Sequence, residues 1–400
     1  MRKGWEYKKL GDCFSYIKNG ANIKQKKDAD GFPITRIETL SGGVFNRDRM
    51  GYAGIHDLSK YADYVLESKD LLMSHINSKT YIGRTVEYKG NNEEAIIHGM
   101  NLLRLKAIHE LIDSTFFAYY TQSGDFKSKI ARIRKDAVNQ SSFAISDLKR
   151  FDIPLPPKST QLAIVSELDK INELIRLKKE QLKDFDNLAQ SLFYEMFGDS
   201  VENEKGWEVK KLGDCFSYIK NGANIKQTKD VDGFPITRIE TLAGGIFNRD
   251  RMGYAGIYDL SKYSAYVLES RDLLMSHINS KTYIGRTVEY KRNNDETIIH
   301  GMNLLRLKAI HDIIDSTFFV YYTKSGDFKS KIARIRKDAV NQSSFAISDL
   351  KRLNIPLPPL SLQRLFAQRI EQIEREKSEV QKSIQDLETL LASRMQYWFE

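Results

Sequence analysis

An internal duplication constrains the fold of this 400-residue chain more than any other feature. Residues 4–157 align with residues 206–359 at a constant offset of 202, without a gap, and 18 of the 154 aligned positions differ. Sequences this similar must share one fold. Solenoid repeats are much shorter, so a repeat of about 200 residues indicates duplicated whole domains. Most of the exchanges are mild, and we therefore expect that whatever one half binds, the other half binds too.

A long amphipathic segment follows each copy. Apolar residues alternate three and four positions apart in residues 158–198, which is typical of a helix with one buried stripe. They are Val165, Leu168, Ile171, Ile175, Leu182, Phe185, Leu192 and Met196. Residues 360–394 repeat the pattern with Phe366, Ile370, Ile373, Val380, Ile384, Leu387 and Leu391. Helices of about forty residues span on the order of 60 Å, so they are suited to setting a distance. The stripe lysines Lys178 and Lys377 either fix the register of a helix pair or reach solvent.

We therefore expect an α+β fold of two near-identical mixed α/β domains, separated by two long antiparallel, coiled-coil-like helices with pseudo-two-fold symmetry. The expected order is a first domain over 1–157, a central helix over 158–198, a linker over 199–205, a second domain over 206–359 and a C-terminal helix over 360–400. Prolines in FDIPLPP and LNIPLPP end the last strand of each domain and lead into the helix.

Composition narrows the class of protein. A hydrophobic content of 41% supports packed cores, no apolar run is long enough to cross a bilayer, and MRKGWEYKKL lacks the apolar core of a signal peptide, so we expect a cytoplasmic protein. Cys13 and Cys215 occupy equivalent positions, which argues against a disulfide framework or a thiolate metal cluster. The net charge of +9 suits a polyanionic partner or serves solubility.

Basic and aromatic residues mark the first group of candidate binding loops. Lys24 follows an Asn-Gly turn, and residues 31–40 alternate like a strand with Arg36 and Glu38 on one face, so Arg36 either forms an ion pair or faces DNA. Two strand-like segments flank the polar loop 75–81. Lysine, arginine and tyrosine there can contact phosphates or base edges, although a solvated hairpin tip is the alternative.

The second group lies further along each domain. Residues 95–108 read as a strand that includes Asn101, and residues 113–133 read as a helix with aromatic core positions. The polar stretch 134–150 follows. Asparagine and glutamine can pair bidentately with adenine, so this stretch is the best candidate for direct base readout.

Combining both groups gives equivalent candidate DNA-binding residues in the two halves. In the first half they are Lys24, Arg36, Lys79, Tyr81, Arg84, Asn101, Lys135, Asn139, Gln140 and Ser141. In the second half they are Lys226, Arg238, Lys281, Tyr283, Arg286, Asn303, Lys337, Asn341, Gln342 and Ser343. No catalytic residue, metal ligand or cofactor site is predicted, because phosphate-loop, dinucleotide-loop and adenine-methyltransferase motifs are not found in the sequence.

Several motifs, occurring twice in the same order, resemble the DNA-specificity subunits of type I restriction-modification systems. They are GWEYKKLGD and its twin GWEVKKLGD, SHINSKTYIGR after DLL, AVNQSSFAIS, and IPLPPxSxQ leading into a long helix. The resemblance implies two target-recognition domains that each read half of a bipartite site in double-stranded DNA. It further implies helices that dock two methyltransferase subunits, which would carry S-adenosylmethionine, while restriction subunits are a further expected partner.

This chain departs from the family pattern in one respect. The two recognition domains of the family usually differ, whereas here they are almost identical, so we expect an interrupted inverted-repeat site. Two alternatives stay open: a protein-binding helical scaffold, and a stand-alone DNA-modifying enzyme.

Overall fold

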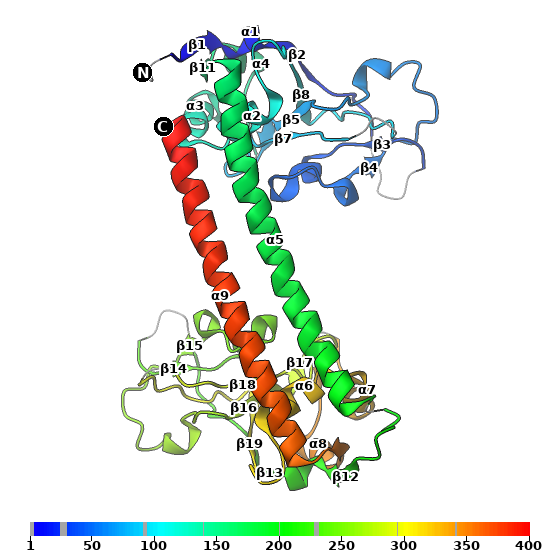
Figure 1. The fold of residues 1–400 in the computed structure, drawn as a ribbon, viewed down its shortest axis with the longest axis vertical. Coiled ribbons are helices and arrows are strands. Elements are labelled where there is room, and N and C mark those ends of the chain that lie inside the picture. Colours follow the sequence, from blue (N-terminus) through cyan, green and yellow to red (C-terminus); the bar gives the residue numbers. More distant parts are fainter. Residues whose placement is uncertain are drawn as a thin grey trace. The chain divides into compact units, whose positions relative to one another are not determined.

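The computed structural model describes residues 4–24, 30–90, 94–138, 140–199, 201–227, 232–293, 295–340 and 342–400. The chain forms two compact units, residues 1–179 with 382–400 and residues 180–381 (Figure 1). Each unit holds one repeated domain and part of each long helix, α5 (Lys158–Phe197) and α9 (Leu360–Phe399). The expected α+β class with two similar domains and two long helices is confirmed.

The first domain is built on an antiparallel sheet of four strands in the order β2-β8-β5-β7. These strands are β2 (Phe14–Asn19), β8 (Leu102–Ala107), β5 (Leu71–Ser74) and β7 (Thr85–Glu87). Smaller sheets pair β1 (Glu6–Lys9) with β11 (Asp152–Leu155), β3 (Pro33–Ile34) with β4 (Gly51–Tyr52), and β10 (Ser141–Ser142) with both β6 (Ile76–Asn77) and β9 (Lys135–Asp136). The short helices are α1 (Leu10–Cys13), α2 (Ser114–Tyr120), α3 (Gly124–Ile133) and α4 (Ile145–Lys149).

The second domain repeats this topology, with the main sheet in the order β13-β19-β16-β18. Its strands are β12 (Glu208–Lys211), β13 (Phe216–Asn221), β14 (Pro235–Ile236), β15 (Gly253–Tyr254), β16 (Leu273–Ser276), β17 (Ile278–Asn279), β18 (Thr287–Glu289), β19 (Leu304–Ala309), β20 (Lys337–Asp338), β21 (Ser343–Ser344) and β22 (Asn354–Leu357). Its short helices are α6 (Ser316–Tyr322), α7 (Gly326–Ile335) and α8 (Ile347–Arg352).

The long helices are built into the domain cores. In the first unit, Ile164 and Leu168 of α5 are fully buried with the sheet and α2. In the second unit, Phe193 of α5 stacks on Phe318 with ring centroids 5.8 Å apart. The expected stripe shifts by one position at two places, because Ile164 and Phe193 are fully buried whereas the predicted Val165 and Leu192 are only partly buried.

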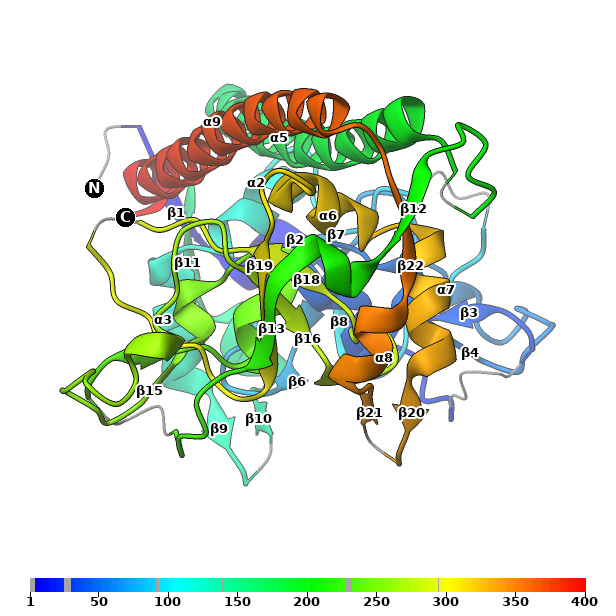
Figure 2. The same ribbon diagram turned by 90° about the horizontal axis from the view of Figure 1, so that it is seen from below.

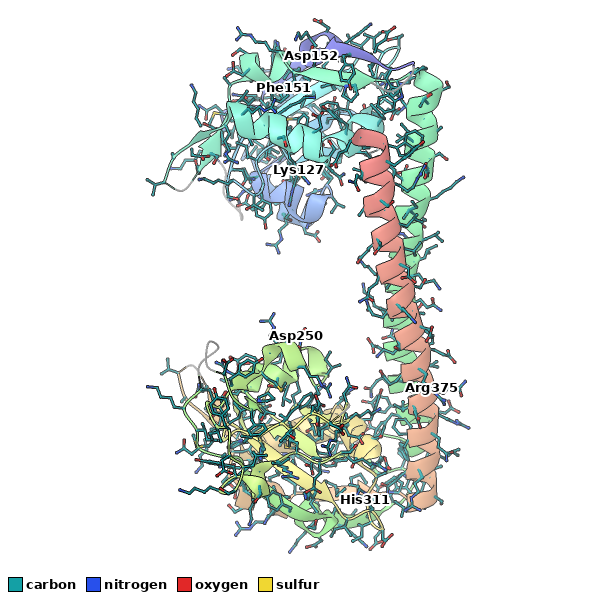
Figure 3. The ribbon with its side chains drawn as sticks, turned by 90° about the vertical axis from the view of Figure 1, so that its left-hand side faces the viewer. Lys127, Phe151, Asp152, Asp250, His311 and Arg375 are labelled. Carbon is teal, nitrogen blue, oxygen red and sulfur yellow. The ribbon has the colours of Figure 1, made fainter. Side chains whose placement is uncertain are left out.

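Within each unit, the segments of α5 and α9 run antiparallel. In the first unit Lys179 pairs with Glu388 at 2.8 Å, and Glu167 pairs with Arg394. In the second unit the Lys377 ammonium lies 2.8 Å from Asp186, and the Phe366 ring lies 5.7 Å from the Phe193 ring. Residue numbers therefore rise along one helix as they fall along the other. Lys377 is only 23% exposed and pairs across the helices, which favours the register-fixing interpretation. Other side chains, such as the labelled Arg375, project from α9 (Figure 3).

Two predicted elements differ from the structure. Residues 31–40 are not one strand: β3 covers only Pro33–Ile34, and a 3-10 helix begins at Ile37. The side chain of Thr39 accepts a hydrogen bond from the Arg36 amide at 2.9 Å, which favours the turn over an extended backbone. The predicted helix over 113–133 is divided into α2 and α3, because Ser123 caps a new helix by accepting from the Phe126 amide.

A buried glutamine joins each domain to its helix. Gln161, with no exposed surface, donates to the carbonyls of Leu111 and Pro156, both at 2.9 Å, and accepts from the Asp113 amide at 2.8 Å. Gln363 makes the equivalent contacts in the second unit. The glutamine of the IPLPPxSxQ motif therefore fixes the direction in which the long helix leaves the domain.

Candidate DNA interface

The loop between β6 and β7 presents cationic and aromatic side chains on a fixed backbone. The Ser74 hydroxyl donates to the Tyr81 carbonyl at 2.6 Å, and the Gly83 amide donates to the Ser74 carbonyl at 2.7 Å. Gly83 has a φ of +80°, a conformation that side chains rarely adopt. Lys79 and Tyr81 stay exposed on this loop. The loop therefore holds potential phosphate-binding and stacking groups in place.

Arg84 at the end of the loop is partly used within the domain. Its guanidinium lies 4.4 Å from the centre of the Tyr81 ring, and it donates to the Leu40 carbonyl at 3.3 Å. In the second unit Arg286 repeats both contacts with Tyr283 and Leu242. This stacking orients the tyrosine, so the pair would act as one surface toward a ligand.

The β9–β10 hairpin lies beside this loop and is joined to it through Asp136. The carboxylate pairs with Lys79 at 3.1 Å and with Arg134 at 2.8 Å, and it accepts from the Ser141 hydroxyl at 2.6 Å. The hydrogen bonds from Ser141 and Lys79 lower the pKa of Asp136, so the carboxyl is ionised near neutral pH. The second unit has the same cluster around Asp338, with Lys281, Arg336 and Ser343.

This arrangement brings several predicted residues onto one surface. Lys79, Tyr81, Lys135 and Gln140 are all exposed on the loop or on the hairpin. Lys281, Tyr283, Lys337 and Gln342 occupy the same positions in the second unit. A basic, amide-bearing hairpin with a neighbouring tyrosine matches what phosphate positioning and base readout require. We call this surface the hairpin surface.

One predicted pair needs correction. Ser141 is 1% exposed, and its hydroxyl donates a hydrogen bond to Asp136. Ser343 is likewise buried and donates to Asp338. Both serines therefore hold the hairpin rather than present a donor to DNA. Asn139 and Asn341 lie outside the described residues, and their predicted roles stay predictions.

The remaining predicted residues belong to other segments of each domain. Arg238 and Asn303 line a small cavity of about 260 Å³ in the second unit. In the first unit the Arg36 guanidinium lies 3.5 Å from Glu38, as an ion pair that is only partly buried. Lys24 and Lys226 are exposed. The structure therefore brings some of the predicted residues together on the hairpin surface, and it brings Arg238 and Asn303 together at a second place.

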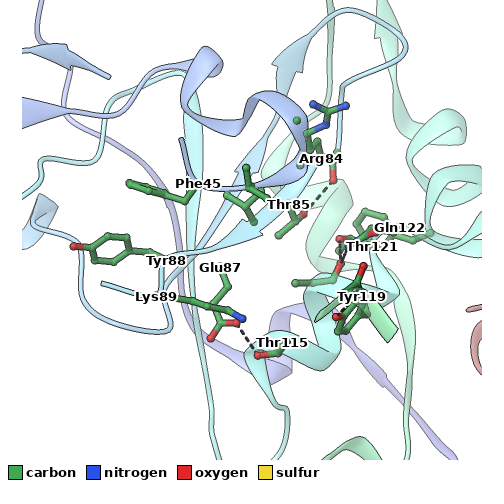
Figure 4. A pocket seen from close by; sticks show the side chains of 18 of the residues that line it. Phe45, Arg84, Thr85, Glu87, Tyr88, Lys89, Thr115, Tyr119, Thr121 and Gln122 are labelled. Atoms are coloured by element: carbon green, nitrogen blue, oxygen red, sulfur yellow. Dashed lines mark hydrogen bonds between the residues drawn. The ribbon is translucent and has the colours of Figure 1, made fainter. Parts of the chain in front are cut away.

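Residues of the domain and of α5 together line a cavity of about 1420 Å³ in the first unit (Figure 4). On the domain side, Glu87 accepts from the Thr115 hydroxyl at 2.6 Å. On the helix side, the Tyr119 hydroxyl donates to Asp169 at 2.6 Å, and burial is the main cause that raises the pKa of this tyrosine. Sequence reasoning did not identify this cavity, because its walls come from segments far apart in the chain.

The two units differ where their domains meet the helices. In the second unit Lys324 replaces Gln122, and its ammonium lies 4.2 Å from the centre of the Tyr321 ring. In the first unit the equivalent Tyr119 is bonded to Asp169. The hairpin surfaces are therefore more alike than the helix contacts.

Two further observations concern other kinds of site. None of the helices in the described part of the chain is both long and apolar enough to cross a membrane. The same described residues contain no cluster of three or more histidine, cysteine, aspartate or glutamate side chains suited to hold a metal ion.

Sequence comparison relates both halves of the chain to one family. The family described as "Type I restriction modification DNA specificity domain" matches residues 2–184 and again residues 204–389. A Methanocaldococcus jannaschii protein, provisionally named the MjaX type I restriction enzyme specificity subunit, is 28% identical over 97% of this chain and 92% of its own length. The StySPI specificity subunit of Salmonella potsdam is 23% identical over 99% of this chain and 88% of its own length.

Solved structures agree on the fold. The type I restriction-modification S subunit from M. genitalium superposes with a TM-score of 0.52 and 14% identity, covering 98% of this chain and 95% of that one. A chain from a structural study of type I system assembly and conformational transition gives a TM-score of 0.60 and 18% identity, covering 100% of this chain and 98% of that chain. With a family match that spans both repeats, the chain belongs to the type I restriction modification DNA specificity family and is a type I specificity subunit.

Proposed function

We propose that this specificity subunit reads double-stranded DNA with both hairpin surfaces and that its site is an interrupted inverted repeat. The observation that carries the proposal is the equivalence of the two surfaces. Residues 134–150 and 336–352 are identical in sequence, and the lysine–aspartate distance is 3.1 Å in both units. Two surfaces with the same residues in the same geometry would select the same half-site.

The antiparallel order of α5 and α9 within each unit supports an inverted rather than a direct repeat. A two-fold relation between DNA-binding domains corresponds to a palindromic site, and the usual half-site separation is about one helical turn, roughly 34 Å. In this proposal the length of the two helices sets the number of unread base pairs between the half-sites.

Catalysis would come from partner subunits. We propose that two methyltransferase subunits, with their S-adenosylmethionine, dock on the long helices, and that restriction subunits join the same complex. Apolar side chains exposed on the helices support such docking: Leu174 and Leu177 on α5 are 48% and 46% exposed, and Leu390 on α9 is 45% exposed. The chain itself would supply recognition and spacing.

The decisive experiment maps methylated adenines in DNA from cells that express this chain with its methyltransferase subunit. The expected result is one bipartite motif whose two halves are reverse complements of each other. An asymmetric motif would show that the two halves read different sequences and would refute the equivalence.

Two simpler assays separate the alternatives. Filter binding at increasing salt should show affinity falling steeply, because phosphate contacts release counterions, whereas a protein-binding scaffold would show no specific DNA binding. Incubation of the purified chain with S-adenosylmethionine and DNA should give no methylation. Methylation by the chain alone would favour a stand-alone enzyme.

A further inference from the structure

A fully exposed valine lies at the tip of each hairpin. The Ala137 amide donates to the Gln140 carbonyl at 2.8 Å, and Val138 directly follows Ala137 in the chain. Val138 is 100% exposed, and the equivalent Val340 is 99% exposed. No other large apolar side chain in the described residues is as exposed; the next is Tyr258 at 75%.

Packing within the domain does not explain these valines. A side chain that is wholly in water contributes nothing to the core. An apolar group in such a position gains free energy only when a partner covers it.

The tip is held on a firm base. Strand β10 pairs with both β6 and β9, and the following Phe143 is 4% exposed. The Phe143 amide donates to the His75 carbonyl at 3.3 Å. In each unit the hairpin projects from its domain on the side away from the long helices (Figure 2). The strands at the base of the hairpin are therefore fixed to the rest of the domain.

The charges around the tip favour DNA over protein as that partner. Lys135 is exposed beside the turn, and Arg134 and Lys79 flank the base of the hairpin. The nearby acid, Asp136, is neutralised by both of these cations. In a DNA groove the base edges form the floor and the phosphates line the two sides. An apolar tip flanked by cations is complementary to this arrangement.

We propose that Val138 and Val340 read a thymine in the major groove by contacting its C5 methyl group. This inference rests on the proposed function. A two-stranded ribbon fits the major groove, and apolar contact with the thymine methyl is an established way to distinguish thymine from cytosine there. A wedge between base steps would instead use the larger Phe, Leu, Ile or Met side chains that minor-groove binders insert.

The test removes only the methyl group. Once methylation mapping has given the site, each thymine in both half-sites is replaced in turn by deoxyuridine, and binding is measured with the full chain in complex with its methyltransferase subunits. We expect one position per half-site where the replacement weakens binding roughly fourfold. This is the effect of losing one methyl group that the contact buries away from water.

Variants show whether the valine makes that contact. The double substitution Val138→Ser with Val340→Ser should lose about that factor in each half-site, roughly sixteenfold in all on thymine DNA, and become insensitive to deoxyuridine at the same positions. Val201→Ser, which changes a valine that is 60% exposed outside the hairpins, should keep the thymine preference.

Three outcomes would overturn the inference. One is sensitivity to deoxyuridine that persists unchanged in the double variant. Another is increased fluorescence of 2-aminopurine beside the tip without any dependence on the methyl group, which indicates a wedge. The third is unaltered DNA binding with weakened methyltransferase association, which indicates a protein contact. In each case sequence-specific binding itself would remain, so the proposed function would stand. Failure of the proposed function would appear separately, as DNA binding with no sequence preference at all.

Discussion

Replacing the buried glutamine of the domain–helix junction should destabilise one unit of the protein selectively. Gln161→Ala removes three hydrogen bonds to backbone groups from a side chain with no exposed surface. At about 1 kcal/mol each, the loss is about 3 kcal/mol. For a unit of roughly 200 residues, this lowers the Tm by roughly 6–12 °C.

Differential scanning calorimetry is the appropriate assay, because a unit that is destabilised alone should unfold in its own transition at lower temperature. Gln161→Ala should move the transition of the first unit to lower temperature, and Gln363→Ala should do the same for the second unit. Gln381→Ala is the matched control, since Gln381 is exposed on α9 and should leave both transitions in place.

A charge substitution tests the geometry more closely. Gln161→Glu keeps an oxygen to accept from the Asp113 amide but turns a carboxylate toward the carbonyls of Leu111 and Pro156. At neutral pH this variant should destabilise the first unit at least as much as Gln161→Ala does. The loss of stability relative to the unsubstituted chain should become smaller on acidification, because the protonated carboxyl can donate a hydrogen bond. A Tm change below about 1 °C in either variant would refute the role of this residue.

Three further predictions concern DNA binding and pH. Lys79→Ala with Lys281→Ala should weaken binding to all sequences alike and reduce the slope of log affinity against log salt by about 2, as measured by filter binding; a loss confined to one sequence would contradict phosphate contact. Gln140→Ala with Gln342→Ala should relax sequence choice by about 1–3 kcal/mol per half-site in competition gel shifts, and unchanged selectivity would exclude direct readout by these residues. Acidification from pH 6.5 to 5 should destabilise the chain by about 2 kcal/mol through His98 alone, because desolvation by burial lowers the pKa of folded His98 to about 3 while the unfolded imidazole titrates near its ordinary pKa of about 6.5 and takes up the proton. In urea titrations, His98→Gln should reduce the change in unfolding free energy between pH 6.5 and 5. An unchanged pH dependence would refute this role of His98.

Local patterns were sufficient for the parts of the fold that depend on periodicity. The three-and-four spacing predicted α5 and α9 closely, since a helix needs only one apolar face and few interruptions. The strand expected over residues 31–40 was wrong beyond Pro33–Ile34, because the Thr39 hydroxyl accepts from the Arg36 amide and a 3-10 helix begins at Ile37. Periodicity does not report such side-chain to backbone bonds.

By itself, the sequence determined that the two halves share one fold and that long helices follow both, because near-identity at a fixed offset and a regular apolar stripe leave little alternative. Only the tertiary structure decided which polar residues are available to a partner. Ser141 and Gln140 are adjacent in the chain, yet the strand pairing buries one against Asp136 and exposes the other. Burial arises from contacts between distant segments, and a local stretch of polar residues in the sequence does not show those contacts.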